Sequence, residues 1–262
     1  MSNIPPIPSA DHLQRRHHNP FAFFFRGTAY GSGPMTSEDR PPGGPISAVV
    51  AGNAMRLTIV QGEQASVRVT APADVLPRIK TRLDGNTLYI ELQSGSYIGD
   101  MKVTIITPGI SSLHLGGSCT AEVSGLSGDC CDIRLSGASR CTAEVSGLSG
   151  DCCDIQLSGA SRATLRGTAG LARIQVAGSS RADLAEVAAG SWEVGCAGAS
   201  TCVIAGPARR AELNASGAST IDASGLQAEQ AHAQAAGAST IRLGRTGALR
   251  QATSGASTIT TA

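Results

Sequence analysis

The 262-residue chain has a net charge of +1, and only 16% of its residues are charged and 3% aromatic. A nearly neutral chain has no overall field to attract nucleic acid or an anionic membrane, so neither partner is expected. With one Trp, four Phe and 32 Gly, the core must be built from small aliphatic side chains. Eight cysteines are too few for a disulfide scaffold and leave the redox compartment open.

Residues 1–45 are expected to form a separate N-terminal arm. They hold most of the 12 prolines together with clustered Gly, a composition typical of an extended linker. We expect neither a secretory signal nor a membrane span here, because no apolar stretch is long enough. The aromatic cluster in the arm should seek burial, and an assembly contact between copies of the chain is one hypothesis. Its members are Phe21, Phe23, Phe24 and Phe25.

Residues 46–107 are expected to form ordinary, longer β-strands. Runs of β-branched and aliphatic residues alternate there with turn signals such as Gln61-Gly62 and Asp84-Gly85. The predicted strands span residues 46–50, 54–60, 66–71, 79–83, 87–92 and 103–107.

Residues 108–262 form a repeat marked by glycine followed by Ala or Ser and then Ser. The marker glycines lie 18 to 22 residues apart, and a fixed period near twenty is typical of a solenoid. The clearest pair is the segment 119–140, which recurs at 141–162 with the single change of Arg134 to Gln156. The marker glycines are Gly117, Gly137, Gly159, Gly178, Gly198, Gly217, Gly237 and Gly255.

Each repeat unit alternates apolar and polar residues with a period of two. Before two of the markers stand Ile133/Leu135 and Ile155/Leu157, with Arg134 or Gln156 between them. Alternate side chains of a strand point to opposite faces, so each unit should hold two short strands joined at the glycine corner. Helical repeats are excluded because no 3.6-residue period is present. We therefore predict an all-β, single-stranded parallel β-helix, or β-solenoid, of about eight short rungs.

Two polar columns follow the corner glycines. A serine column is expected to hydrogen-bond along the stack of rungs. The position after each serine is Arg140, Arg162 and Arg181 and then changes to Thr, which gives a basic stripe that continues into a Thr stripe. The serine column comprises Ser139, Ser161, Ser180, Ser200, Ser219, Ser239 and Ser257.

The doubled Cys-Cys pairs leave three alternatives open. One cysteine of each pair should face inward and pack as a small hydrophobic residue, as Cys119, Cys141, Cys196 and Cys202 are expected to do. Equivalent positions one rung apart are also close enough for a disulfide between Cys130 and Cys152 or between Cys131 and Cys153. The third alternative is a metal ion neutralising the flanking carboxylates, although a flat ladder supplies ligands from one side only. The flanking carboxylates are Asp129, Asp132, Asp151 and Asp154.

The opening strands resemble those of a known family. The segments 46–53 (ISAVVAGN), 57–62 (LTIVQG), 67–71 (VRVTA), 85–90 (GNTLYI) and 103–108 (VTIITP), followed by 113–118 (LHLGGS), are similar in order to GIN-domain proteins. That family is described as the head of an auto-transporter adhesin. The resemblance implies a right-handed β-helix over residues 46–262, with opening strands in 46–107 and the repetitive solenoid in 108–262. It also implies a location in the cell envelope or outside the cell, and supplies no catalytic residues.

The predicted function is a non-enzymatic scaffold or surface-adhesion module that binds a cell-surface or polysaccharide ligand by stacked polar ladders. No catalytic, cofactor or metal site is expected. The alternative is a structural filament protein, since the last rung, residues 254–260, should present an unpaired edge through which copies could self-associate end to end. A carbohydrate-acting β-helix enzyme is a remote alternative, because corners of a few residues leave no room for the walls of a cleft.

Overall fold

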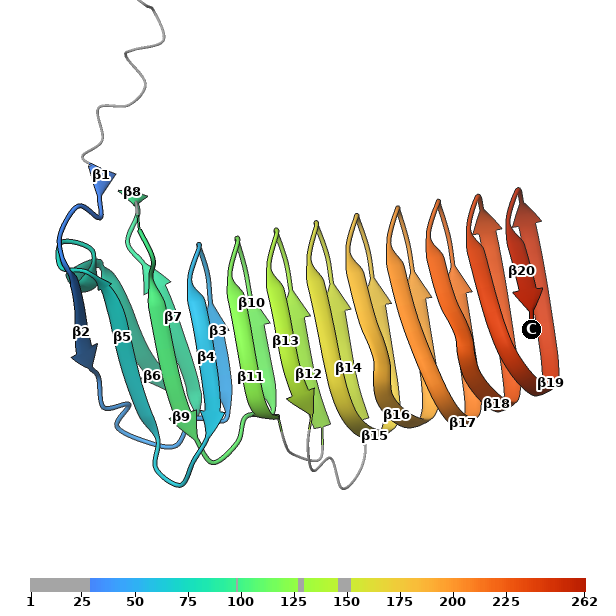
Figure 1. Ribbon diagram of the computed structural model, residues 1–262, viewed down its shortest axis with the longest axis horizontal. Helices are drawn as coiled ribbons and strands as arrows, with labels where there is room; N and C mark the ends of the chain where they lie inside the picture. The colour runs from blue at the N-terminus through green and yellow to red at the C-terminus, as the bar shows by residue number, and fades with distance from the viewer. Residues whose placement is uncertain (1–28, 98, 127–129, 146–151) are drawn as a thin grey trace, which may run out of the picture.

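A computed structural model describes residues 29–97, 99–126, 130–145 and 152–262, and they form one elongated stack of strands (Figure 1). About 70% of the chain is strand, and the described residues contain no α-helix, only the short 3-10 helix η2, Leu76–Arg78. The predicted β-solenoid is confirmed, with about seven turns where the sequence predicts about eight rungs. The difference arises because eight corner glycines enclose seven complete repeats.

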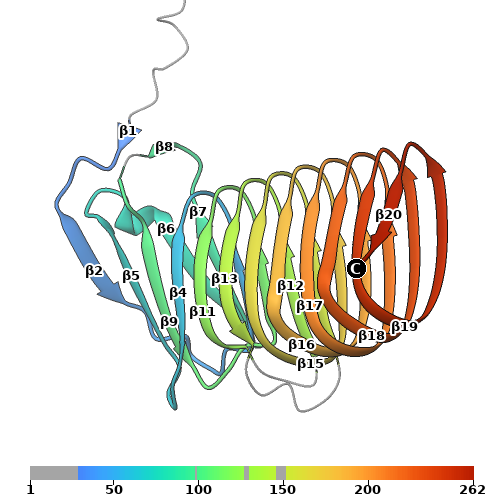
Figure 2. The same cartoon turned by 45° about the vertical axis from the view of Figure 1, so that its right-hand side comes forward.

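The solenoid proper runs from β10 to β20, and every neighbouring pair of strands in it is parallel. In the later turns one long strand bends through the corner opposite the glycines, so that it serves two successive sides of the coil (Figure 2). The strands are β10 Ser112–Leu115, β11 Thr120–Leu126, β12 Cys130–Leu135, β13 Arg140–Val145, β14 Cys152–Leu157, β15 Arg162–Val176, β16 Arg181–Cys196, β17 Thr201–Ala215, β18 Thr220–Gly237, β19 Thr240–Gly255 and β20 Thr258–Thr261.

The opening strands do not simply precede the solenoid, because they contribute two further turns to it. β3 and β4 stack in parallel on β10 and β11, and on their other side they pair in parallel with β7 and β9. The stack order at this end is therefore β7/β9, β3/β4, β10/β11, which differs from the chain order (Figure 1). The opening strands are β3 Ala48–Ala51, β4 Arg56–Gln61, β5 Ser66–Pro72, β6 Ile79–Asp84, β7 Thr87–Leu92, β8 Ser96–Tyr97 and β9 Lys102–Thr107.

Antiparallel strands cap this end of the stack. β5 pairs with β9 and β6 with β7, both antiparallel, and β2 (Met35–Asp39) pairs antiparallel with β5. A short β1 (Ala29–Tyr30) lies beside β8. β1 and β2 fall inside the segment 1–45, so part of the expected arm pairs with the opening strands. The phenylalanine cluster at residues 21–25 lies outside the described residues.

The core is a single column of small aliphatic side chains between the two sides of the coil. Leu135 and Leu157 lie opposite each other in register and are 1% and 2% exposed, as the repeat predicts. The only Trp of the chain, Trp192, is fully buried between Ala172 on one neighbouring turn and Ala211 on the other. One large ring thus replaces the small residues of its column in one turn.

The corner glycines are required by the stacking as well as by their backbone angles. Gly178 has φ +75°, and a Cβ placed on it would lie 2.5 Å from the carbonyl oxygen of Gly159. Asn53, with φ +71°, heads the same column, since a Cβ on Gly117 would lie 2.3 Å from its carbonyl oxygen. Asn is among the few residues that adopt this conformation without Gly, so the β3–β4 corner belongs to the same series.

The two copies of the duplicated segment do not place identical residues opposite each other along their whole length. β12 and β14 align their identical residues, as in Cys131 opposite Cys153. β11 and β13 are instead displaced by two residues, so that Ala121, not Cys119, lies opposite Cys141. A shift of two keeps inward residues inward, because the side-chain period of a strand is two. Cys119 is therefore not the counterpart of Cys141 and lies one turn before Ser139, in the serine column.

Candidate functional site

The paired cysteines divide between the surface and the core. Cys130 and Cys152 project outward and form a disulfide, with their Cα atoms 4.7 Å apart. Cys131 and Cys153 point inward and are buried free thiols. Two of the three alternatives thus apply, each to a different member of the pairs. No group of metal-ligating side chains gathers among the described residues, and two of the flanking carboxylates, Asp129 and Asp151, lie outside them.

Most of the buried thiols are poor nucleophiles, and an exception is Cys196, whose pKa is lowered by hydrogen bonds with Cys202 and Ser200. Burial raises the pKa of Cys141 to about 12. The hydrogen bond with Cys153, together with burial, raises the pKa of Cys131, and the contact with Cys196 does the same for Cys202. Because the thiolate is the reactive form, these cysteines serve as core residues and not as a catalytic site.

The serine column lies just inside the glycine corner and is buried from Ser139 to Ser239. Its hydroxyls bond chiefly to backbone carbonyl oxygens and not to one another. The Oγ of Ser200 donates to the carbonyl of Val176 at 3.0 Å, and that of Ser219 donates to Cys196 at 3.1 Å. In the later turns the column therefore ties a corner to the preceding turn, whereas the hydroxyls of Ser139 and Ser161 donate within their own corners, to Ser136 and Ser158. Burial leaves the column no role in binding an external ligand.

Outward side chains form ladders on both sides of the coil. We call the side built from β7, β3, β10, β12, β14 and the second halves of β15–β19 the first-strand face. The other side, built from β9, β4, β11, β13, the first halves of β15–β19 and β20, is the second-strand face. The two faces lie on either side of the shared core (Figure 2).

A row of side-chain amides runs along the first-strand face, and we call it the amide row. Its members, on successive turns, are Gln156, Gln175, Asn214 and Gln234, with Gly195 between the second and the third. The amide of Gln175 lies over Gly195, where a Cβ would be 2.3 Å from its Oε1. An open groove of about 400 Å³ follows the row, and the last three amides line it.

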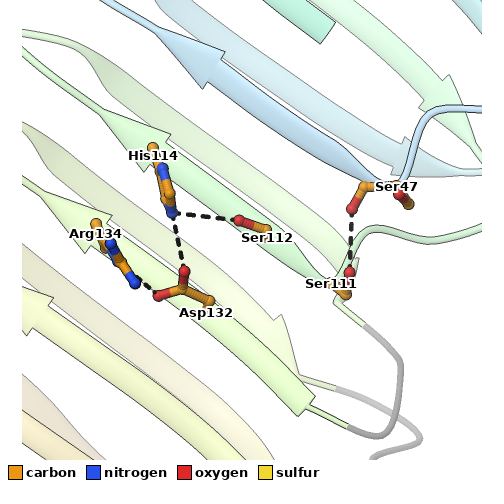
Figure 3. A network of polar contacts seen from close by, with 6 residues as sticks. All are labelled: Ser47, Ser111, Ser112, His114, Asp132 and Arg134. Atoms are coloured by element: carbon orange, nitrogen blue, oxygen red, sulfur yellow. Dashed lines mark hydrogen bonds and ion pairs between the residues drawn. The ribbon is translucent and has the colours of Figure 1, made fainter. Parts of the chain in front are cut away.

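A polar network crosses β10 and β12 on the same face (Figure 3). His114 Nε2 lies 3.3 Å from Ser112 Oγ and 3.0 Å from Asp132 Oδ2, and Arg134 Nε donates to Asp132 Oδ1 at 3.1 Å. A Ser-His-Asp relay needs the serine and the carboxylate on different ring nitrogens, whereas here both contact the same one. The network therefore orders surface side chains and does not activate the serine.

Two further grooves open on the first-strand face, each of about 410 Å³. One is lined by Arg210, His232 and Arg250, and the other by Tyr89, His114 and Arg134. All three grooves therefore open on the same face of the coil. The sequence shows the amides only as polar spacers, because their shared row depends on which turns are neighbours.

The chain matches the family described as "putative auto-transporter adhesin, head GIN domain" over residues 46–202 and 182–262. It belongs to this family. The match covers both the opening strands and the repeats, so the resemblance seen in residues 46–118 is confirmed.

Solved structures similar to this GIN-domain protein share its fold. A "putative adhesin" from Bacteroides fragilis is 16% identical, with a TM-score of 0.62 over 90% of this chain and 100% of that one. A second, from Parabacteroides distasonis, is 13% identical, with a TM-score of 0.60 over 88% and 98%. A "putative lipid binding protein" from the same species is 14% identical, with a TM-score of 0.60 over 89% and 99%. Among curated proteins none matches.

Within the part of the chain that the structure describes, we find no helix with the length and hydropathy that crossing a membrane requires.

Proposed function

We propose that this GIN-domain protein is a non-enzymatic surface-binding module that holds a polysaccharide or similar cell-surface ligand along the amide row. The observation that carries the proposal is the recurrence of Gln175, Asn214 and Gln234 along one open groove. An amide both donates and accepts hydrogen bonds, which suits the hydroxyl groups of a glycan. A polymer with a repeating unit can make the same weak contact on successive turns, and such linked contacts strengthen binding together.

The location proposed for this module is the cell envelope or the exterior. The adhesin description of the family supports it, as does the disulfide between Cys130 and Cys152, since disulfides persist in oxidising compartments.

A glycan-cleaving activity has less support. Glycosidases generally place two carboxyl groups on either side of the scissile bond. In the three grooves described above, Glu91 is the only carboxylate among the lining residues.

The test is binding of the full chain to a panel of neutral insoluble polysaccharides, measured by pull-down and then by calorimetry on the best ligand. The variant Gln175→Ala/Asn214→Ala/Gln234→Ala should weaken binding roughly ten-fold, which corresponds to three lost hydrogen bonds of about 0.5 kcal/mol each. Gln227→Ala, an exposed amide on β18 outside the groove lining, is the control and should bind like the wild type. Equal binding by the triple variant would refute the amide row, and released reducing sugar would favour the enzyme.

A second candidate, self-association into a homo-oligomer or filament, is supported by the last turn. Within the described residues, β20 pairs only with β19, and residues 248–255 of β19 pair only with β18. Another strand could pair with the backbone groups on the outer side of these strands.

Light scattering over a range of concentrations, with electron microscopy of the same samples, tests this candidate. Fibres, or a mass that grows with concentration, would support it. Because charged side chains discourage pairing of edge strands, Thr260→Lys on β20 should shift such assemblies towards monomer. A monomer at every concentration would rule it out.

A further inference from the structure

A column of cations crosses the second-strand face. Lys102 of β9, Arg56 of β4 and Arg140, Arg162 and Arg181 of β13, β15 and β16 lie in register, with Thr120 of β11 between Arg56 and Arg140. We call these five residues the basic ladder. Six adjacent strands at the usual spacing of about 4.8 Å make it about 24 Å long. The sequence shows only the three arginines of the repeats, because the stacking of Lys102 and Arg56 depends on the unexpected order of the opening strands.

The basic ladder is exposed and forms no ion pair within the described residues, although Arg181 attracts the carboxylate of Asp222 from farther away. All five side chains are exposed, and for none of them does the described part of the chain supply a carboxylate within 4.0 Å. Like charges directly opposite each other on neighbouring strands repel.

Arginines in the other ladders are arranged differently. Arg166 pairs with Glu186 on the next turn at 3.1 Å, and Arg173 pairs with Glu193 at 3.0 Å. Some neighbouring turns therefore stack opposite charges, whereas the five cations of the basic ladder, spread over six strands, have no opposite charge in their own column.

The fold does not need cations at these positions. The same column continues as Thr201, Thr220, Thr240 and Thr258, which occupy equivalent places on the later turns. Threonine occupies the equivalent strand position on the later turns, so stacking of the turns does not require a cation there. We therefore look for the reason for the cations in something that they bind.

We propose that the basic ladder binds a linear polysaccharide that carries carboxylate or sulfate groups. A column one residue wide and several turns long fits an extended chain with anions repeated along it. The threonine hydroxyls farther along the column can hydrogen-bond the uncharged units of the same polymer. Single-stranded nucleic acid would also need exposed aromatic rings for base stacking, but the chain is only 3% aromatic and its one Trp is buried.

The basic ladder lies on the opposite side of the core from the amide row, so the two proposals can fail independently. Polygalacturonate and dextran sulfate are suitable probes, with neutral dextran for comparison, and anionic phosphatidylglycerol vesicles test a lipid surface. Affinity is measured with the full chain by calorimetry across a salt series centred on about 0.15 M. We expect the anionic polymers to bind with an affinity that falls as salt rises, whereas any binding of dextran by the amide row should not depend on salt.

The decisive variant is Arg140→Thr/Arg162→Thr, which installs the residue already found farther along the column. The control is Arg209→Thr/Arg245→Thr, which removes the same charge from exposed sites outside the ladder. The ladder variant should bind polygalacturonate at least about ten-fold more weakly with a shallower salt dependence, and the control within about two-fold of wild type. Emission of the buried Trp192 verifies that both variants are folded.

Three results would overturn the proposal. They are an affinity for the anionic polymers that does not change with salt, equal losses in the ladder variant and the control, and binding to the vesicles alone. Loss of binding to neutral glycans in the amide-row variant, with polygalacturonate binding intact, would confirm that the two surfaces act separately.

Discussion

The close stacking of the glycine corners predicts that an added methyl group separates neighbouring turns. A Cβ on Gly178 would lie 2.5 Å from the carbonyl oxygen of Gly159, nearly 1 Å short of the 3.4 Å at which ordinary contact begins. The amide of Ser179 donates to that oxygen at 2.8 Å, and the amide of Ala177 donates to the carbonyl of Leu157 at 2.9 Å. Gly178→Ala must therefore weaken these bonds in addition to straining the backbone.

The magnitude follows from a matched control. Gly206 in β17 has φ +94°, but no atom lies within 4 Å of the place that a Cβ would occupy, so Gly206→Ala carries the backbone strain alone, about 1–2 kcal/mol. Gly178→Ala adds two weakened hydrogen bonds at about 1 kcal/mol each, for a total of about 3–4 kcal/mol. Both changes reduce the entropy of the unfolded chain equally, so that effect cancels in the comparison.

Urea unfolding followed by the emission of Trp192, which lies on the turn after Gly178, measures both variants. Because repeat arrays can unfold in parts, the comparison uses this one local probe under identical conditions for both proteins. If Gly178→Ala proved no less stable than Gly206→Ala, the approach of neighbouring corners would not be the reason for glycine there.

Four further predictions concern single side chains. Ser200→Ala should lower the free energy of unfolding by about 1 kcal/mol in urea titrations, because one buried hydrogen bond is lost while the carbonyl that accepted it keeps a backbone donor. Trp192→Ala should cost about 3–5 kcal/mol, and Trp192→Phe much less, since the indole Nε1 has no partner among the described residues; circular dichroism melts distinguish the two. A thiol assay in denaturant should count six free cysteines before reduction and eight after, and the Cys130→Ser/Cys152→Ser variant should count six in both cases and lose about 3 kcal/mol of stability. Stability should fall as pH rises above 9, because the unfolded Cys141 thiol ionises there while the folded one keeps its proton to about 12; Cys141→Ala should flatten this fall in denaturation midpoints measured across pH.

The repetitive half of the fold is readable in the sequence because the marker glycines count the turns directly. Leu135 and Leu157 stand at the same offset before their glycines, and the structure places them opposite each other. The order of the opening turns is not readable in this way. Strand-forming runs such as residues 87–92 predict a strand, but their sequence does not indicate which other strand will pair with it.

It is equally hard to predict from the sequence which of two strand registers forms when they differ by two residues. Matching Cys119 with Cys141 or Ala121 with Cys141 satisfies the inward–outward pattern equally well, since both offsets are even. The corner decides between them, because Gly117 must lie beneath Gly137 for the carbonyl-to-glycine approach to form. Sequence identity between the copies is therefore a weaker guide to stacking than the position of the glycine.

The amide row and the basic ladder show how this fold converts register into a surface. The turns above and below each side chain place the equivalent residues next to it at a fixed spacing. A single polar residue such as Gln175 or Arg162 therefore becomes part of a ladder. Some ladders pair opposite charges on neighbouring turns, as Arg166 and Glu186 do, and others stack like charges, as Glu193 and Glu212 do. A ladder of one sign is costly to keep in a protein of net charge +1, and threonine fits the same column. The presence of the cations is thus better explained by an anionic partner than by the fold.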